Sequence, residues 1–231
     1  MKKYKAVFFD LDHTLWDFDL NSYETLNDLF NHHLLKEKGI DDFVKFVEIY
    51  RNVNHQMWDD YHKNLITKAE LRTGRFKRTL NTFRIEDDSL AEVLSSRYLE
   101  ICPMKKNLFP DALTVLDYLH QNYSLHIITN GFKEVQYLKI KNSGLEKYFA
   151  QIHISEEIGF KKPQSEIFDY AVSQAKTVHE NCIMIGDNLD TDIDGAINAG
   201  IDHIYFNPEK LTTPKKVTRQ ISRLEELLQI L

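Results

Sequence analysis

Cysteine is scarce in this sequence, which limits the kinds of site it can build. Only two of the 231 residues are cysteine, and Cys102 and Cys182 lie far apart, outside any Cys-x-x-Cys pair. This argues against a disulfide framework and against a zinc ribbon. Cys182 lies in the apolar run Cys182-Ile183-Met184-Ile185, which is typical of a buried thiol.

Long hydrophobic runs are also lacking. No stretch approaches the roughly 18 apolar residues of a membrane span. The N-terminus carries basic residues before apolar ones, as a signal peptide does, but the apolar run 6–9 ends at Asp10. A signal peptide needs an apolar region of about 7–15 residues. We therefore expect a cytoplasmic protein with no membrane partner.

The chain has only a small excess of charge of one sign. Its 29 basic and 35 acidic side chains leave a formal charge of −6, and the charges are mixed along the chain, as on a solvated surface. A nucleic-acid-binding protein would be expected to show a basic stripe, so we expect no nucleic-acid partner. The length and the hydrophobic content of 42% suffice for a large core.

Five short apolar runs are the clearest structural pattern, and each ends in a polar cluster. They are rich in β-branched and aromatic residues, and helical patterns separate them, which is typical of buried parallel strands in βαβ units. The sequence therefore predicts an α/β fold. The apolar runs are 6–9, 125–128, 151–154, 183–185 and 203–206, and the clearest helical patterns among them are 111–121, 165–175 and 191–198.

The segment between the first two runs has a different pattern. Helical spacing of apolar residues recurs through it with no strand between, and two sites fit a capping box, Asn21 with Glu24 and Thr67 with Glu70. We predict an inserted all-α helical cap over residues 17–104. The α/β catalytic core then comprises residues 1–16 and 105–231.

Acidic residues gather at two predicted strand ends, where an open parallel sheet binds its ligands. The first run leads into Asp10-Leu11-Asp12-His13-Thr14, and a spacing of two lets both carboxylates face the same side. The fourth leads into Gly186-Asp187, with Asp190 and Asp192 following. Packing explains such charges poorly because charges near a core need partners. Phosphate or metal chemistry is indicated, although Asp10 and Asp12 could only form a turn and Asp190 could only cap a helix.

Two further strand ends carry weaker signals. Thr129-Asn130-Gly131 offers a hydroxyl and backbone N–H groups that can approach an anion, but the same tripeptide also makes a good turn. Lys161-Lys162-Pro163 precedes a helical pattern, where a lysine can bind phosphate. Adjacent surface lysines are more often merely solvated, so each signal alone leaves both interpretations open.

Taken together, the four signals resemble the haloacid dehalogenase superfamily. Its motifs are DxDxT, a hydrophobic strand ending in Thr or Ser, a Lys often before Pro, and GDxxxxD. They stand here, in that order, as Asp10-x-Asp12-x-Thr14, Thr129, Lys162-Pro163, and Gly186-Asp187 through Asp192. The resemblance spans essentially the whole chain. It implies a Rossmann-like core with strand order 3-2-1-4-5, and it makes the helical insert similar to the C1 cap.

The resemblance also implies a reaction, the hydrolysis of a phosphate monoester. Asp10 takes the position of the nucleophile that forms an aspartyl-phosphate intermediate, and Asp12 that of the general acid and base. The implied cofactor is Mg²⁺, with Asp10, the backbone carbonyl of Asp12 and Asp187 as ligands. Asp192 would orient the metal's waters or the lysine.

The implied phosphate site uses side chains of the two weaker motifs. Lys162 and Thr129 would hold the phosphoryl oxygens, assisted by backbone N–H groups near Asn130 and Gly131. Lys161 competes with Lys162 for this role, and Lys162 is preferred because it precedes Pro163, as the motif requires.

The cap sequence around Asn54, Trp58 and Arg75 is similar to the caps of pyrimidine 5′-nucleotidases. That similarity implies a small phosphorylated metabolite as substrate, a nucleoside monophosphate above all, with Trp58 stacking on the base and Arg75 binding its polar edge. Alternatively, Trp58 belongs to the cap core and Arg75 is a surface charge. The same insert would also suit a sugar phosphate or a small phospho-acid.

Several rival functions share parts of this pattern. A haloacid dehalogenase lacks the second aspartate of the first motif, so Asp12 argues against it, whereas a phosphomutase keeps that residue and stays open. A response-regulator receiver domain would be far shorter, with its phosphorylated aspartate later in the chain. A non-catalytic binding protein is disfavoured because the motif residues are intact. The sequence does not indicate an oligomeric state.

Overall fold

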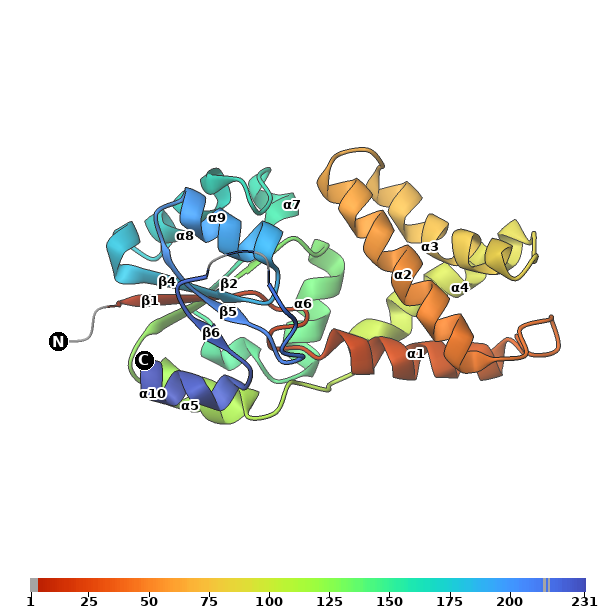
Figure 1. Ribbon diagram of the computed structural model, residues 1–231, viewed down its shortest axis with the longest axis horizontal. Coiled ribbons are helices and arrows are strands. Elements are labelled where there is room, and N and C mark those ends of the chain that lie inside the picture. Colours follow the sequence, from red (N-terminus) through yellow and green to blue (C-terminus); the bar gives the residue numbers. More distant parts are fainter. Residues whose placement is uncertain (1–3, 214, 216) are drawn as a thin grey trace. The chain divides into compact units, whose positions relative to one another are not determined.

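The computed structural model describes residues 4–213, 215 and 217–231; the N-terminal residues 1–3, part of the predicted core and of the weak signal-peptide pattern, lie outside them. The chain divides into two compact units (Figure 1). One comprises the residues up to Phe18 together with Lys106–Leu231, and the other is Asp19–Lys105. Assigning these units as catalytic core and cap stays a prediction.

The first unit is built on a parallel sheet of six strands in the order β3-β2-β1-β4-β5-β6. The predicted order of the first five strands is confirmed. The sixth was not predicted, because two residues are too few to show a periodicity. The strands are β1 Ala6–Phe9, β2 Ser124–Thr129, β3 Gln151–Ile154, β4 Cys182–Gly186, β5 Asp202–Phe206 and β6 Gln220–Ile221.

Helices flank this sheet, with α8 (Ser165–Gln174) and α9 (Asp194–Asn198) over one face and α5 (Ala112–His120) and α10 (Leu227–Ile230) over the other (Figure 1). The predicted helices 111–121 and 165–175 are confirmed. The predicted helix 191–198 is instead a π-helical turn, Leu189–Ile193, followed by α9. Among the described residues, three α-helices of this unit were not predicted: α6 (Lys133–Asn142), the short α7 (Ser155–Ile158) and the short α10.

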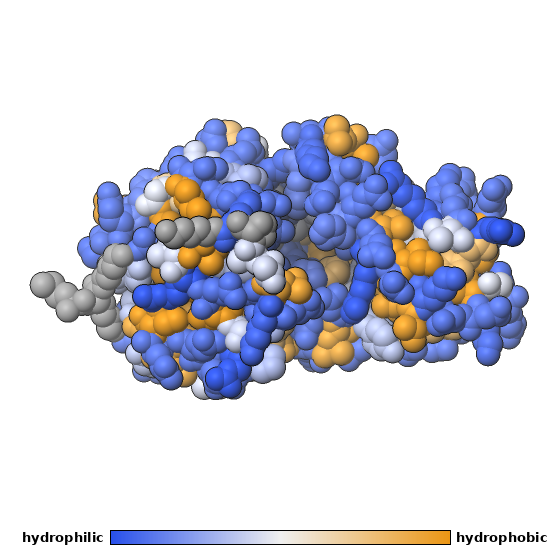
Figure 2. All heavy atoms as spheres, in the orientation of Figure 1, coloured by the Kyte–Doolittle hydropathy of each residue, from blue (hydrophilic) through white to orange (hydrophobic). Residues whose placement is uncertain are grey.

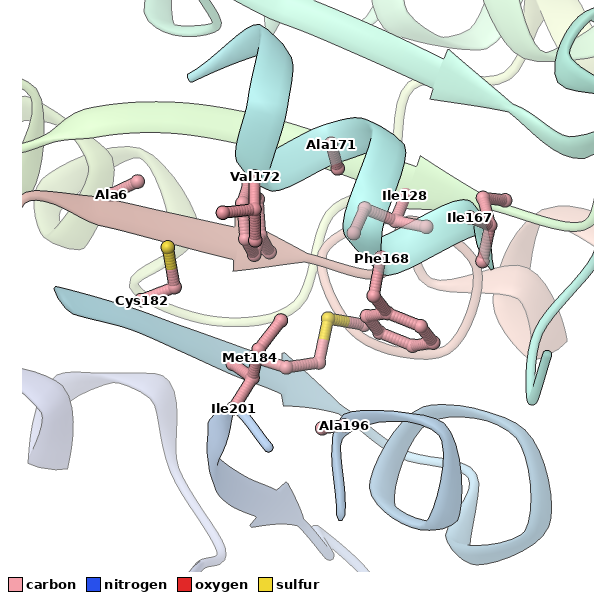
Figure 3. Close-up of a cluster of buried hydrophobic side chains, with 11 residues drawn as sticks. Ala6, Ile128, Ile167, Phe168, Ala171, Val172, Cys182, Met184, Ala196 and Ile201 are labelled. Carbon is pink, nitrogen blue, oxygen red and sulfur yellow. The ribbon is translucent and has the colours of Figure 1, made fainter. Parts of the chain in front are cut away.

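A cluster of buried hydrophobic side chains joins the sheet to α8 and α9 (Figure 3). Phe168 of α8 lies beside Met184 of β4, and Ala196 of α9 lies at the edge of the cluster. Burying one such side chain fully contributes roughly 1.5–3 kcal/mol. Cys182 is a free, buried thiol in this cluster, as predicted. The packing fixes β1 and β4 side by side, and their ends carry the acidic motifs.

The second unit contains most of α1 (Phe18–His32) and all of α2 (Phe43–His62), α3 (Lys68–Thr82) and α4 (Asp88–Ile101). The predicted capping box of Thr67 and Glu70 is confirmed at the start of α3. The box predicted at Asn21 is wrong: α1 begins at Phe18, so Asn21 lies inside the helix and is buried.

Hydrophilic side chains cover most of the face seen in Figure 2, and hydrophobic ones form separate patches on it. Within the described residues, every helix is too short or too polar to cross a membrane.

Candidate active site

Three carboxylates meet at the carboxyl ends of β1 and β4. The two strands pair in parallel with Phe9 beside Ile185, and the backbone N–H of Asp10 continues the ladder to the carbonyl of Ile185 at 2.9 Å. The residues that follow the strands therefore leave the sheet side by side. Asp10, Asp187 and Asp192 each offer an oxygen within 4.8 Å of the other two.

The turn after β4 folds back so that Asp192 rejoins the strand end. The backbone N–H of Asn188 donates to Asp192 Oδ2 at 3.1 Å. A side chain on Gly186 would not fit, because its Cβ would lie 2.3 Å from that same oxygen. Asn188 rather than Asp190 caps the following turn, since its Oδ1 accepts from the N–H groups of residues 190 and 191. Asp190 instead pairs with Lys215 at 2.5 Å.

Lys162 is the ammonium group that the structure brings to these carboxylates. Its Nζ lies 2.5 Å from Asp10 Oδ1 and 2.6 Å from Asp192 Oδ1, and it donates to the carbonyl of Ile128 at 2.8 Å. The side chain of Asn130 fixes the backbone of Lys162 at two points, both at 2.9 Å. The predicted site residue Asn130 thus positions the lysine through its side chain.

The cluster carries more negative than positive charge, with three carboxylates facing one ammonium. Burial raises the pKa of Asp10 well above its usual range; Lys162 opposes the rise, and Asp192 and Asp187 add to it. Burial also raises the pKa of Asp187 to about 6, with His13 opposing and Asp192 adding. Burial would lower the pKa of Lys162, but Asp10 and Asp192 outweigh it and raise that pKa.

This donor set fits a divalent cation. Carboxylate oxygens are the ligands that magnesium prefers, and a buried excess of negative charge is costly unless a cation offsets it. Lys162 reaches Asp10 and Asp192, whereas Asp187 accepts a hydrogen bond from Thr14 Oγ1 at 3.0 Å. Asp10, Asp187 and Asp192 could therefore share a metal ion.

Thr129 has its hydroxyl oxygen fully occupied as an acceptor. It accepts from the N–H of Gly131 at 3.1 Å and from Gln136 Nε2 at 2.7 Å. A hydroxyl has two acceptor lone pairs and one donor proton, so Thr129 can still donate its proton to another group. The N–H of Gly131, predicted to bind phosphate, is directed to Thr129 in this structure.

Asp12 contacts two residues of α6 that the sequence reasoning missed. Its Oδ1 lies 2.6 Å from Lys139 Nζ, and its Oδ2 accepts from Gln136 Nε2 at 2.8 Å. Both partners are buried. The sequence carried only a weak signal for these contacts. Gln136 and Lys139 lie three residues apart after Thr129-Asn130-Gly131, but no hydrophobic stripe marks the helix that carries them.

The predicted cap contacts lie in the second unit. Arg75 donates from Nη1 to Asn54 Oδ1 at 3.1 Å, its guanidinium lies 5.3 Å from the centre of the Tyr98 ring, and only 4% of the residue is exposed. The alternative that Arg75 is a surface charge is therefore wrong. Trp58 is half-buried and packs edge-on against Tyr61. Their role as substrate contacts stays a prediction.

Comparisons with known proteins agree with this geometry. The family model of the haloacid dehalogenase-like hydrolases matches residues 4–200. The chain is 34% identical to the pyrimidine 5′-nucleotidase YjjG of Escherichia coli (strain K12), over 99% of this chain and 98% of YjjG. It is 35% identical to the pyrimidine 5′-nucleotidase PynA of Streptococcus pneumoniae (strain ATCC BAA-255 / R6), over 99% and 95%.

A solved structure shares the whole fold. The HAD-hydrolase YfnB of Bacillus subtilis, crystallised bound to magnesium, superposes with a TM-score of 0.87 at 30% identity, over 99% of each chain. The family model covers far more than half of this chain, and the strand order and the acidic strand ends agree with it. This chain therefore belongs to the haloacid dehalogenase-like hydrolases.

Proposed function

We propose that this chain is a magnesium-dependent phosphate monoester hydrolase that acts through an aspartyl-phosphate intermediate. The observation that carries the proposal is the meeting of Asp10, Asp187 and Asp192 around Lys162, with Asp12 two residues beyond Asp10. A phosphate monoester dianion repels nucleophiles, so catalysis must offset its charge and fix the geometry of attack. This site offers both cationic groups and ordered carboxylates.

Magnesium would be held by Asp10, the backbone carbonyl of Asp12 and Asp187, and when bound it would supply a positive charge to the phosphoryl oxygens. Asp192 would keep the neighbouring lysine and the metal's waters oriented. The ammonium of Lys162 and the free hydroxyl proton of Thr129 would hold phosphoryl oxygens, and burial excludes water that would weaken these contacts.

The reaction then follows from the two aspartates of the first motif. A carboxylate oxygen of Asp10 bonds to phosphorus while the ester P–O bond breaks, and Asp12 gives its proton to the leaving oxygen. In the second step Asp12 takes a proton from water, which attacks the phosphorus of the aspartyl phosphate. Inorganic phosphate leaves, and Asp10 and Asp12 return to their starting states.

The proposed substrate is a small phosphorylated metabolite in the cytoplasm, a nucleoside 5′-monophosphate with a pyrimidine base. The full-length similarity to two pyrimidine 5′-nucleotidases supports this substrate class. The half-buried Trp58 supplies an aromatic face of the kind that stacks on a base.

The decisive experiment is a phosphate-release assay with magnesium across nucleoside monophosphates, sugar phosphates and small phospho-acids. We expect pyrimidine nucleoside monophosphates to have the highest kcat/KM, by about tenfold or more, as specific pocket contacts allow. Weak, even turnover of all classes would contradict the nucleotidase assignment. Transfer of phosphate within a sugar phosphate, without its release, would identify a phosphomutase instead.

A further inference from the structure

We propose that Lys139, together with Gln136, is a positioning residue that holds the Asp12 carboxylate where it can protonate the leaving oxygen. The inference rests on the proposed function, because it concerns the general acid of that reaction. It assigns a purpose to two buried polar residues of α6 that none of the four motifs contains.

Each oxygen of Asp12 has its own donor on α6. Lys139 Nζ lies 2.6 Å from Oδ1, and Gln136 Nε2 donates to Oδ2 at 2.8 Å. Two contacts to opposite oxygens resist rotation about both side-chain bonds of the aspartate. A general acid needs this control, because proton transfer requires hydrogen-bond reach of the leaving oxygen and errors of about 0.5 Å matter.

The burial of Lys139 is difficult to explain by stability alone. Only 4% of the residue is exposed, and among the described residues Asp12 is the sole ion-pair or hydrogen-bond partner of its ammonium. The ammonium also lies 4.4 Å from the centre of the Trp16 ring and 5.5 Å from that of Phe18. A buried ion pair contributes little net stability, so its position beside the proposed acid indicates a functional reason.

The chain makes room for this arrangement at Gly131. A Cβ there would lie 2.2 Å from Gln136 Nε2, so only glycine lets the amide reach inward. That same nitrogen also donates to Thr129 Oγ1 at 2.7 Å. One amide therefore joins Asp12 to Thr129, and it fixes the proton donor relative to the group that would hold the phosphoryl oxygens.

The proposal predicts an effect that depends on the leaving group. A nucleoside monophosphate releases an alkoxide, which needs a proton in the transition state, whereas p-nitrophenyl phosphate releases a phenolate stable enough to leave without one. A displaced Asp12 therefore harms the first substrate far more. General fold damage or weaker phosphate binding would harm both substrates alike.

The test compares kcat/KM, which reports the first phosphoryl transfer, for uridine 5′-monophosphate and p-nitrophenyl phosphate. Lys139→Met keeps the aliphatic stem and removes the ammonium, and we expect a loss of about tenfold or more on the nucleotide, within the range of general acid catalysis. The loss on the aryl ester should stay below about threefold. Lys139→Arg should recover most of the nucleotide activity, and Lys141→Met, an exposed lysine of the same helix, should match the wild type.

Equal losses on both substrates, or no loss on either, would overturn the proposal. A double-mutant cycle gives a second measurement: in an Asp12→Asn background, Lys139→Met should lower the residual activity by no more than about twofold, because the two residues act together. If Lys139→Met does not fold in a thermal melt, Gln136→Met removes the second contact to Asp12. Because Gln136 also donates to Thr129 Oγ1, this variant should lose activity on both esters, with the larger loss on the nucleotide. A wild-type protein that hydrolyses neither ester would reject the proposed function itself.

Discussion

Two glycines, Gly131 and Gly186, shape this site because they have no side chain. Neither Gly131 nor Gly186 has the positive φ that favours glycine. Each instead leaves the space that a side chain of the candidate site occupies, Gln136 in the first case and Asp192 in the second. The sequence pattern suggested that Gly131 exposes its N–H to an anion, whereas the structure shows a steric reason for a glycine there.

Gly186→Ala should therefore damage the acidic cluster. The added Cβ would lie 2.3 Å from Asp192 Oδ2, and the overpacking should lower the free energy of unfolding by about 1–3 kcal/mol. Displacing Asp192 should also weaken magnesium binding, which titration calorimetry can measure. Gly74→Ala is the matched control, because its Cβ meets only the flexible end of Met57. Equal stability of both variants would contradict this account.

Asp10→Asn should separate activity from stability. Without the carboxylate no aspartyl phosphate can form, so phosphate release should fall by about a thousandfold or more, as for other essential nucleophiles. The melting temperature should not fall, because the change removes one of three mutually repelling buried charges. Asp41→Asn, at an exposed position, serves as the control and should leave both properties unchanged. Retained phosphate release by Asp10→Asn would reject the nucleophile assignment.

At the scale of elements, α6 shows why a functional helix can escape a sequence pattern. Its buried residues are Gln136, Lys139 and Ile140, so the face that enters the protein is mostly polar. Helix prediction from a single sequence depends on a hydrophobic stripe, and α6 lacks one. The buried polar residues of α6 have tertiary partners in Asp12 and Thr129, and the role that we propose for the helix depends on the same contacts.

The adjacent strands β2 and β3 carry a second buried polar feature, a stacked histidine pair. The rings of His126 and His153 lie 5.5 Å apart at an interplanar angle of 14°. Burial lowers the pKa of each to about 4, from an ordinary value of 6.5, and His126 adds to the lowering at His153. Both residues are therefore neutral in the folded protein at pH 5, where unfolded chains would protonate them.

This pair predicts a pH dependence of stability. As the pH falls below 6.5, the unfolded chain takes up protons that the folded chain excludes, so the free energy of unfolding falls, with the full effect reached near pH 4. Urea denaturation at pH 7 and pH 5 measures the change. The change should be smaller in His153→Leu and unaltered in His55→Leu, whose histidine is exposed. An identical change in all three proteins would contradict the prediction.

At the scale of the whole molecule, we predict that the three carboxylates make the stability of the fold depend on a divalent cation. Because burial raises the pKa of Asp187 to about 6, its ionised form destabilises the metal-free protein as the pH rises through that value. In the proposed function magnesium would bind the ionised form, and a ligand that binds only the folded state stabilises it. We expect magnesium to raise the melting temperature at pH 7.5 by several degrees, and less at pH 5.

Chelation provides the reverse test of this coupling. EDTA should abolish both phosphate release and the added thermal stability, and magnesium should restore both. Asp187→Asn should lose most of the magnesium-induced shift while keeping its metal-free stability. An unchanged shift in Asp187→Asn would show that the cation binds elsewhere.

The sequence predicted much of this site because its signals are local. Asp10, Thr129 and Asp187 each follow a short apolar run, and such runs identify buried parallel strands without further information. The carboxyl ends of parallel strands share one edge, so the meeting of Asp10 and Asp187 follows from the strand order. Lys162 was preferred over Lys161 on its place before Pro163, and it is the lysine whose ammonium reaches Asp10 and Asp192.

Hydrophobic periodicity and motif spacing depend on neighbours along the chain, so they indicated the α/β class and the two acidic strand ends directly. The order of the first five strands came from the resemblance to the superfamily and is confirmed by the sheet. The contacts of Asn130 and Gly131 with Lys162 and Thr129, the burial of Arg75 and the approach of Lys139 to Asp12 became visible only in the folded chain. These facts depend on atoms brought together from distant positions. Asp12 and Lys139 are separated by 127 residues, and no pattern within either segment records that they touch.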